Sequence, residues 1–125
     1  MESNGINAVH AFIDAFNAQD HEMLAASLNY PHLRLANGRF LEVESAAEYA
    51  RLSDSLESRL RAEGWDHTVI RSISVVHSGE QKEHIALTID RCDATGHVYN
   101  SFDTLWIATL VDDHWGIQFR SSFLR

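Results

Sequence analysis

The stretch that decides the fold is VYNSFDTLWIATLVDDHWGIQFRSSF, residues 98–123. Two runs rich in apolar residues flank Asp112-Asp113, and aspartate is one of the few residues besides glycine that tolerate a positive φ in a two-residue turn. The pattern predicts a β-hairpin in which Val111 lies opposite His114. That register puts five further pairs on one apolar and aromatic face: Leu110–Trp115, Ala108–Ile117, Trp106–Phe119, Thr104–Ser121 and Phe102–Phe123.

The opposite face of this hairpin is predicted to be mixed in character. It carries Leu105 and Ile107 beside Gln118 and Arg120. Asp103 and Arg120 lie diagonally on this face, which favours a charge pair that stabilises the sheet or a contact between two copies of the chain.

The residues before the hairpin predict helices first and strands afterwards. Apolar residues at helical spacing predict a helix over residues 5–18 with Asn4 as N-cap, followed by a short helix capped by Asp20 that ends before Pro31. Residues 32–36 and 39–43 alternate as strands across Asn37-Gly38. Two longer strand-like runs cover residues 65–77 and 84–92.

The third helix has the clearest boundaries. Ser45-Ala46-Ala47-Glu48 is a capping-box pattern, and Gly64 suits the position after the last turn. Its apolar stripe consists of Tyr49, Leu52, Leu56 and Leu60. Helices followed by long antiparallel strands indicate an α+β fold, and the twist of such a sheet predicts that it wraps around this helix as a cone.

Composition limits the class of protein. The 125 residues are predicted to form one domain over residues 1–125, and the net charge of −8 at pH 7 argues against nucleic acid and anionic membranes as partners. No apolar run reaches the length of a membrane span. The single cysteine, Cys92, cannot form an internal disulfide, so we expect a cytoplasmic location.

Two motifs carry a resemblance to a known family. These are Phe16-Asn17-Ala18-Gln19-Asp20 at the end of the first helix and Asp112-Asp113-His114-Trp115-Gly116-Ile117-Gln118, which is similar to an Asp-Gly-x-Trp-x-Ile ending with Asp113 in place of glycine. The chain thus resembles the nuclear transport factor 2-like (NTF2-like) superfamily, which includes ketosteroid isomerase, scytalone dehydratase and SnoaL-like polyketide cyclases, and within it the small bacterial members. The resemblance implies a cystatin-like cone of three N-terminal helices packed in a strongly curved antiparallel or mixed sheet. It also implies a homodimer through the outer sheet face, where Leu105 and Ile107 are expected.

The enzymes of this superfamily place a carboxylate, histidine or tyrosine inside the cone. Ketosteroid isomerase uses an aspartate base, a tyrosine of the oxyanion hole and a protonated aspartate. The first helix of this chain offers His10 and Phe16 but no tyrosine, and the strand after the second helix offers His32 and Arg34 but no carboxylate. The catalytic residues of ketosteroid isomerase therefore have no matching residues at these positions of this chain.

The candidate catalytic residues are His32 and Arg34. They share a strand face at a spacing of two, directly after Tyr30-Pro31. A neutral imidazole in a partly dry cone suits a general base, and a guanidinium suits an anionic group or an enolate. The alternative is a strand rim whose polar groups are satisfied by hydrogen bonds.

Further residues are candidates for ligand binding. Trp65 and His67 either line the mouth of the cone or belong to a plain core edge. Arg91 ends an apolar stripe, where a cation must be paired, extended to solvent or used for binding. The full set of predicted ligand-binding residues is Tyr30, Tyr49, Trp65, His67, Arg91 and Trp106. No metal-ligand spacing, phosphate-binding loop or dinucleotide motif is present, so we expect no metal and no cofactor.

Two hypotheses about function remain open. In the first, the cone holds a pocket for a small apolar molecule, in the simplest case one with a carbonyl group, and any catalysis is a cofactor-free proton transfer of the isomerase, dehydratase or cyclase type. In the second, the protein is a non-catalytic binding or dimerisation module whose cone is plugged by Phe12, Phe16, Tyr49 and Trp106. Cavity volume separates them, because ligand pockets start at roughly 300 Å³.

Overall fold

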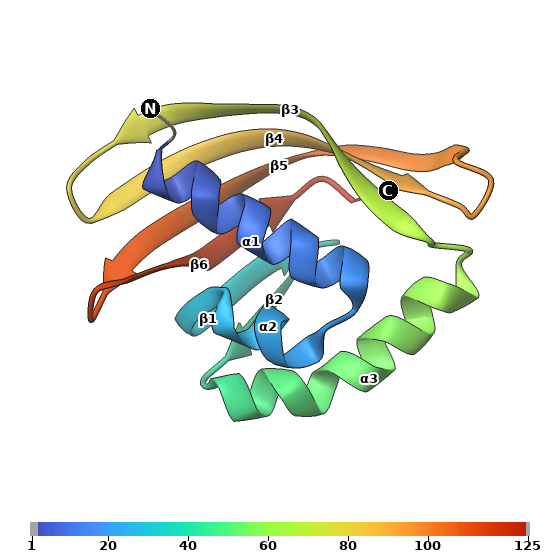
Figure 1. Ribbon diagram of the computed structural model, residues 1–125, viewed down its shortest axis with the longest axis horizontal. Coiled ribbons are helices and arrows are strands. Elements are labelled where there is room, and N and C mark those ends of the chain that lie inside the picture. The colour runs from blue at the N-terminus through green and yellow to red at the C-terminus, as the bar shows by residue number, and fades with distance from the viewer. Residues whose placement is uncertain (1–2, 125) are drawn as a thin grey trace.

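The computed structural model describes residues 3–124 and confirms the predicted α+β order of elements (Figure 1). The helices are α1 (Asn4–Ala18), α2 (His21–Ala26) and α3 (Ala46–Ala62). The strands are β1 (Leu28–Ala36), β2 (Arg39–Val43), β3 (His67–Ser78), β4 (Lys82–Cys92), β5 (Val98–Val111) and β6 (His114–Ser122). The first of these strands starts four residues earlier than predicted and includes Pro31, whose bond to Tyr30 is cis.

The six strands of residues 3–124 form one curved sheet in the order β2-β1-β6-β5-β4-β3. Neighbours pair antiparallel except β1 and β6, which are parallel, so the sheet is mixed. The backbones of these two strands approach closely at Gly116, where an added Cβ would lie 2.8 Å from the carbonyl carbon of Leu28. The parallel pair joins the first hairpin to the last one and thereby completes the cone.

The helix inside the cone is α1, and the prediction that the sheet wraps around the third helix is wrong. In Figure 1, α1 crosses the concave face of β3–β6, whereas α3 lies at the bottom, packed on α2 and β2. The physical reason is the width of the apolar surface. The first helix buries Gly5, Ala8, Val9, Phe12, Ile13 and Ala15, but the third buries only Tyr49 and Ser53.

Side chains cap all three helices at their N-termini. The caps are Ser3, where Asn4 was predicted, and the predicted residues Asp20 and Ser45, whose side-chain oxygens accept from Ile6, Met23 and Glu48 N–H groups. The carboxylate of Glu48 accepts from the backbone N–H of Glu44. These caps satisfy donors that no intrahelical carbonyl can reach.

The terminal hairpin follows the predicted register only near its turn. Asp112 and Asp113 have φ values of 50° and 62°, and Val111 pairs with His114, as predicted. The predicted pairs Leu110–Trp115 and Ala108–Ile117 are also present.

Beyond these pairs, Gln118 is an extra residue in β6, a β-bulge that shifts the register by one position. Trp106 therefore pairs with Arg120 instead of Phe119, and Thr104 pairs with Ser122 instead of Ser121. A shift of one residue exchanges the two faces of a strand. Arg120 consequently points into the cone.

The predicted charge pair between Asp103 and Arg120 is wrong for the same reason. Asp103 lies on the outer face, where its Oδ1 accepts a hydrogen bond of 2.8 Å from Thr88 Oγ1. The guanidinium of Arg120 lies inside, 4.8 Å from the ring centre of Phe12. The two side chains are on opposite faces of the sheet.

Aromatic side chains fill the inner end of the cone. The ring of Phe12 meets Trp106 edge-on at 4.9 Å and stacks on Phe16 at 5.8 Å, and Phe16 meets Trp65 edge-on at 5.2 Å. The indole N–H groups of Trp65 and Trp106 each donate to a nearby threonine hydroxyl, so these two tryptophans are buried without an unsatisfied donor. We call these four residues, Phe12, Phe16, Trp65 and Trp106, the aromatic cluster.

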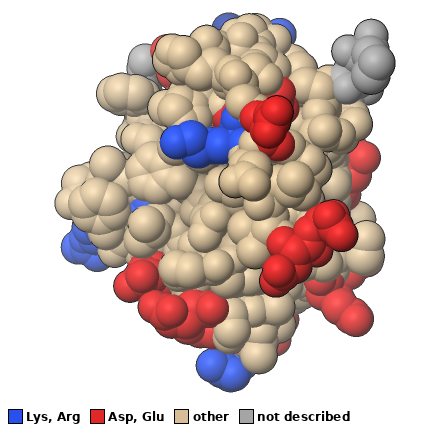
Figure 2. Space-filling view, turned by 90° about the vertical axis from the view of Figure 1, so that its left-hand side faces the viewer, with Lys and Arg blue, Asp and Glu red and all other residues tan. Residues whose placement is uncertain are grey.

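The outer surface is acidic, in line with the net charge of −8. Figure 2, which views the left-hand side of Figure 1, shows more acidic than basic side chains on that face. Among residues 3–124, no helix is long and apolar enough to cross a membrane.

Candidate functional site

Two neighbouring cavities lie inside the cone, one lined by residues of the aromatic cluster and the other reaching α3. The inner cavity has a volume of about 40 Å³, and the outer cavity has a volume of about 290 Å³. They share four lining residues, Phe16, Arg34, Arg91 and Arg120. The inner cavity has room for a few waters at most, whereas the outer one is close to the size at which ligand pockets begin.

The outer cavity has an apolar wall and a cationic wall. Tyr49, Leu56 and Leu60 of α3 supply the first wall, with Phe16 and Leu124 beside them. The sheet supplies the second wall, because β1, β4 and β6 each contribute one arginine. We call Arg34, Arg91 and Arg120 the arginine cluster.

Arg34 is the least satisfied member of this cluster. Its Nε is buried and has no hydrogen-bond partner among residues 3–124, and burial together with the charges of Arg120 and Arg91 lowers the pKa of Arg34 to about 10. A buried donor without a partner costs free energy, and so does the repulsion between like charges.

The side chain of Arg120 is held by His32 and by aromatic rings. Its Nε–H donates to Nε2 of His32 over 3.2 Å, and its guanidinium lies 4.8 Å from the ring centre of Phe12 and 5.7 Å from that of Trp106. Burial lowers the pKa of Arg120.

His32 is fully buried behind Arg120, and both of its ring nitrogens are engaged. The Nδ1 lies 3.0 Å from the carbonyl oxygen of Ile117, which can only accept, while the Arg120 Nε–H can only donate. The ring is therefore neutral, with its proton on Nδ1. Burial, and secondarily the charge of Arg120, lowers the pKa of His32 to about 3.

Arg91 is the one member of the arginine cluster with a carboxylate partner among residues 3–124. Its Nη1 lies 3.0 Å from Oε1 of Glu63, and the same oxygen accepts the hydroxyl of Tyr99 over 2.7 Å. Glu63 follows the last turn of α3, so this contact ties the helix end to the rim of the sheet.

The structure brings half of the predicted site residues to the cavities. Arg34 and Arg91 line both, Trp106 lines the inner one and Tyr49 lines the outer one. His32 lies directly behind the cationic wall through its contact with Arg120.

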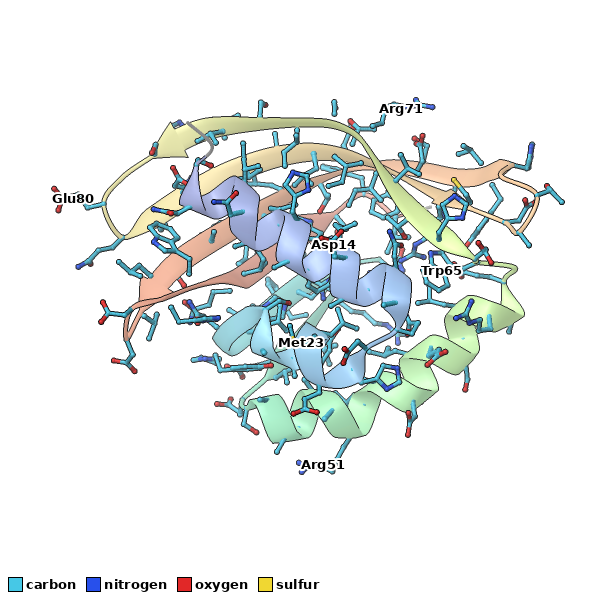
Figure 3. The ribbon with its side chains drawn as sticks, in the orientation of Figure 1. Asp14, Met23, Arg51, Trp65, Arg71 and Glu80 are labelled. Carbon is cyan, nitrogen blue, oxygen red and sulfur yellow. The ribbon has the colours of Figure 1, made fainter. Side chains whose placement is uncertain are left out.

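Three predicted ligand-binding residues line neither cavity. Tyr30 donates its hydroxyl to the carbonyl of Ala25 in α2, and His67 pairs with Asp66 at the surface. Trp65 lies between the ends of α1 and α3 (Figure 3), buried beneath Phe16 with the guanidinium of Arg61 4.9 Å from its ring centre. The structure therefore separates these three from the other predicted site residues.

Sequence reasoning missed Arg120 and Arg59 as cavity residues. The alternating strand pattern predicted that Arg120 lies on the outer face of the sheet, because no local feature of the sequence indicates the bulge at Gln118. Arg59 also lines the outer cavity, and its signal was available: it lies three residues after Leu56, on the side of the helix that carries the apolar stripe.

Within the described part of the chain, no three His, Cys, Asp or Glu side chains are grouped so as to hold a metal ion. Cys92 is buried, and burial raises the pKa of its thiol. Among the described residues, the polar side chains that line the outer cavity are four arginines, the Tyr49 phenol, the Glu63 carboxylate and the amides of Asn37 and Asn100.

Comparisons with known proteins agree with this geometry at the level of the fold. Residues 6–119 match the family described as NTF2-like protein (DUF6841). A comparison with curated proteins finds no match.

Solved structures similar to this chain share the cone. An NTF2-like protein with a cystatin-like fold from Novosphingobium aromaticivorans is 15% identical with a TM-score of 0.72, covering 94% of this chain and 77% of that one. An NTF2-like protein from Cytophaga hutchinsonii is 14% identical with a TM-score of 0.71, covering 96% and 94%. A ketosteroid isomerase-like protein from Erwinia carotovora atroseptica is 17% identical with a TM-score of 0.67, covering 96% and 92%.

Proposed function

Because the chain belongs to the NTF2-like family DUF6841, whose fold encloses a cone, we propose that it binds a small apolar, carbonyl-bearing molecule in the outer cavity. One observation carries this proposal: a cavity of about 290 Å³ has an apolar wall from α3 facing convergent guanidinium groups from the sheet. Ligand sites combine apolar walls with a few convergent polar groups in this way.

The plug hypothesis applies to the inner end of the cone only. The aromatic cluster leaves an inner cavity of about 40 Å³, which is too small for an organic ligand. Tyr49, the fourth residue of the predicted plug, lines the outer cavity, which is open. A ligand would therefore lie between α3 and the arginine cluster.

The binding test uses 2-acetylnaphthalene, a neutral aromatic ketone, as the probe. We expect saturable binding by isothermal titration calorimetry, and we expect Leu60→Trp, which fills the outer cavity, to weaken it by about tenfold or more. The matched control is Leu41→Trp, because Leu41 is exposed on β2 and lines neither cavity. Unsaturable binding, or equal loss in both variants, would contradict the proposal.

Binding without chemistry is better supported than catalysis. A base must be free to take a proton, yet Nε2 of His32 already accepts from Arg120, and a pKa of about 3 makes this imidazole a weak base at neutral pH. Catalysis by His32 and Arg34 requires the Arg120 contact to open when substrate enters.

Hydrogen exchange tests the catalytic version directly. Proton abstraction next to the carbonyl of 2-acetylnaphthalene in D₂O replaces the methyl hydrogens with deuterium, which proton NMR follows. A binding protein leaves the exchange at the background rate. If the wild type accelerates it, His32→Ala should return the rate to background, and an unchanged rate in that variant would exclude His32 as the base.

The proposal includes a homodimer through the outer sheet face and a cytoplasmic location. Leu105 and Ile107 lie half-buried on that face, and Cys92 is a free thiol. Native mass spectrometry of protein purified from its own host should find the dimer mass together with any retained small molecule. Ile107→Lys should shift the mass to the monomer, and a dimer that persists in this variant would place the interface elsewhere.

A further inference from the structure

We propose that the ligand of the outer cavity is an organic carboxylate, held by Arg34 and Arg120 at the junction of the two cavities with its apolar body against α3. This inference rests on the proposed function and names the chemical class of ligand. A neutral carbonyl compound uses the same space but leaves the charge of the site uncompensated.

The first argument is the distribution of charge. The chain has 10 Lys and Arg against 18 Asp and Glu, yet at least four of the ten basic side chains line the outer cavity: Arg34, Arg59, Arg91 and Arg120. Glu63 is the one acidic side chain among its described lining residues. An acidic protein thus concentrates positive charge inside its own cone, where a bound anion would be attracted over short distances.

The second argument is the number of guanidinium groups available. Arg91 is paired with Glu63 at the rim. Arg120 is oriented by His32, and this contact uses only Nε, so its terminal nitrogens are not engaged by that bond. Arg34 has a buried Nε with no hydrogen-bond partner in the described part of the chain. Within the arginine cluster, the guanidinium groups of Arg34 and Arg120 therefore remain for a ligand.

The third argument is the match between these groups and a carboxylate. Arginine donates parallel N–H bonds to the two oxygens of a carboxylate, and a bond between charged groups is about twice as strong as one between neutral groups. The aromatic rings of Phe12 and Trp106 hold Arg120 from behind, so its orientation is set before the ligand arrives.

The fourth argument concerns the apolar part of the ligand. Leu56, Leu60 and Tyr49 face the arginine cluster across the outer cavity. A flat ring or short chain fits between these walls, whereas inorganic phosphate has no apolar surface to bury against α3. The site therefore favours an aryl or alkyl carboxylate.

The test compares 2-naphthoate with 2-acetylnaphthalene, which has nearly the same shape and no charge. By isothermal titration calorimetry of the wild-type protein, 2-naphthoate should bind about tenfold more tightly or better. Arg34→Met should weaken the binding of 2-naphthoate more than that of the ketone and thereby remove that preference, because the variant keeps most of the side-chain volume and loses the charge. The control is Arg51→Met, since Arg51 points away from the cone on the far side of α3 (Figure 3) and should change neither affinity.

Three results would overturn the carboxylate assignment. They are equal binding of ketone and naphthoate, an unchanged preference in Arg34→Met, and tighter binding of 2-naphthyl phosphate than of 2-naphthoate. Failure of both naphthalene probes to bind would instead contradict the proposed function itself. Circular dichroism of each variant separates loss of binding from loss of folding.

Discussion

The inner and outer parts of the cone differ in how far their buried polar groups are satisfied by hydrogen bonds. In the inner part, the indole N–H groups of Trp65 and Trp106 and the imidazole of His32 all have protein partners. Where the inner part meets the outer cavity, Arg34 keeps a buried Nε without a partner among residues 3–124, beside two other arginines. This difference indicates that the polar groups of the inner part stabilise the fold. It also indicates that the arginines lining the outer cavity lower the stability of the fold and are retained for a function.

The largest expected effect comes from the aromatic cluster. Phe12→Ala removes the ring that contacts Phe16, Trp106 and Arg120, and it should lower the free energy of unfolding by about 3–5 kcal/mol. Urea denaturation followed by tryptophan fluorescence measures this loss. Phe40→Ala is the control, because that ring is 69% exposed and its removal should cost less than about 0.5 kcal/mol. Similar losses of unfolding free energy in Phe12→Ala and Phe40→Ala would contradict the assignment of the aromatic cluster as the stabilising part of the cone.

The next effect is the pH dependence that His32 gives to stability. Its pKa is about 3 in the folded protein and 6.5 in the unfolded chain, so between these values the unfolded state binds more protons. The contribution of His32 to the free energy of unfolding is therefore fully present above pH 6.5, and it is lost as the pH falls from 6.5 towards 3.

His32→Asn removes the titrating group and keeps an N–H donor for Ile117. Between pH 7 and pH 5 the wild type should lose about 2 kcal/mol more than this variant. Urea denaturation at a series of pH values gives the difference curve, in which the other acidic and histidine groups cancel. Parallel curves for the two proteins would mean that His32 is not held neutral by burial.

A smaller effect of opposite sign is expected in the outer cavity. Arg34→Met removes an unpartnered buried donor and relieves repulsion within the arginine cluster, so the ligand-free protein should become more stable by about 1 kcal/mol. Thermal and urea denaturation check the sign, with Arg51→Met expected near zero. A destabilised Arg34→Met would show that this guanidinium serves the fold, as in the inner part.

The smallest effect is expected at the rim. Glu63 is 42% exposed, so Glu63→Gln should change the free energy of unfolding by no more than about 0.5 kcal/mol. The same change frees Arg91 and should tighten the binding of 2-naphthoate. Calorimetry measures the second effect, and a weaker affinity would mean that Glu63 orients Arg91 for the ligand instead of competing for it.

The candidate site was predictable only where a side chain follows the regular period of its element. Arg91 ends the apolar stripe of β4, and Tyr49 begins that of α3, so their inward positions could be predicted from spacing. Arg120 could not be predicted in this way, because the extra residue Gln118 reverses the faces of the strand after it. The side chain of Gln118 accepts from Thr109 of the neighbouring strand β5, and it donates to the carbonyl of Pro31 in β1, which is 87 residues away in the chain.

The sequence by itself determined the order of the elements, the three helix starts to within one residue, the turn of the terminal hairpin and the family resemblance. These features depend on contacts between near neighbours, such as a cap and the first turn of its helix. Only the tertiary structure decided that α1 occupies the cone, that β1 runs parallel to β6, and that Arg120 joins Arg34 and Arg91 inside. Those outcomes depend on competition among distant surfaces for the same buried space, which no local pattern records.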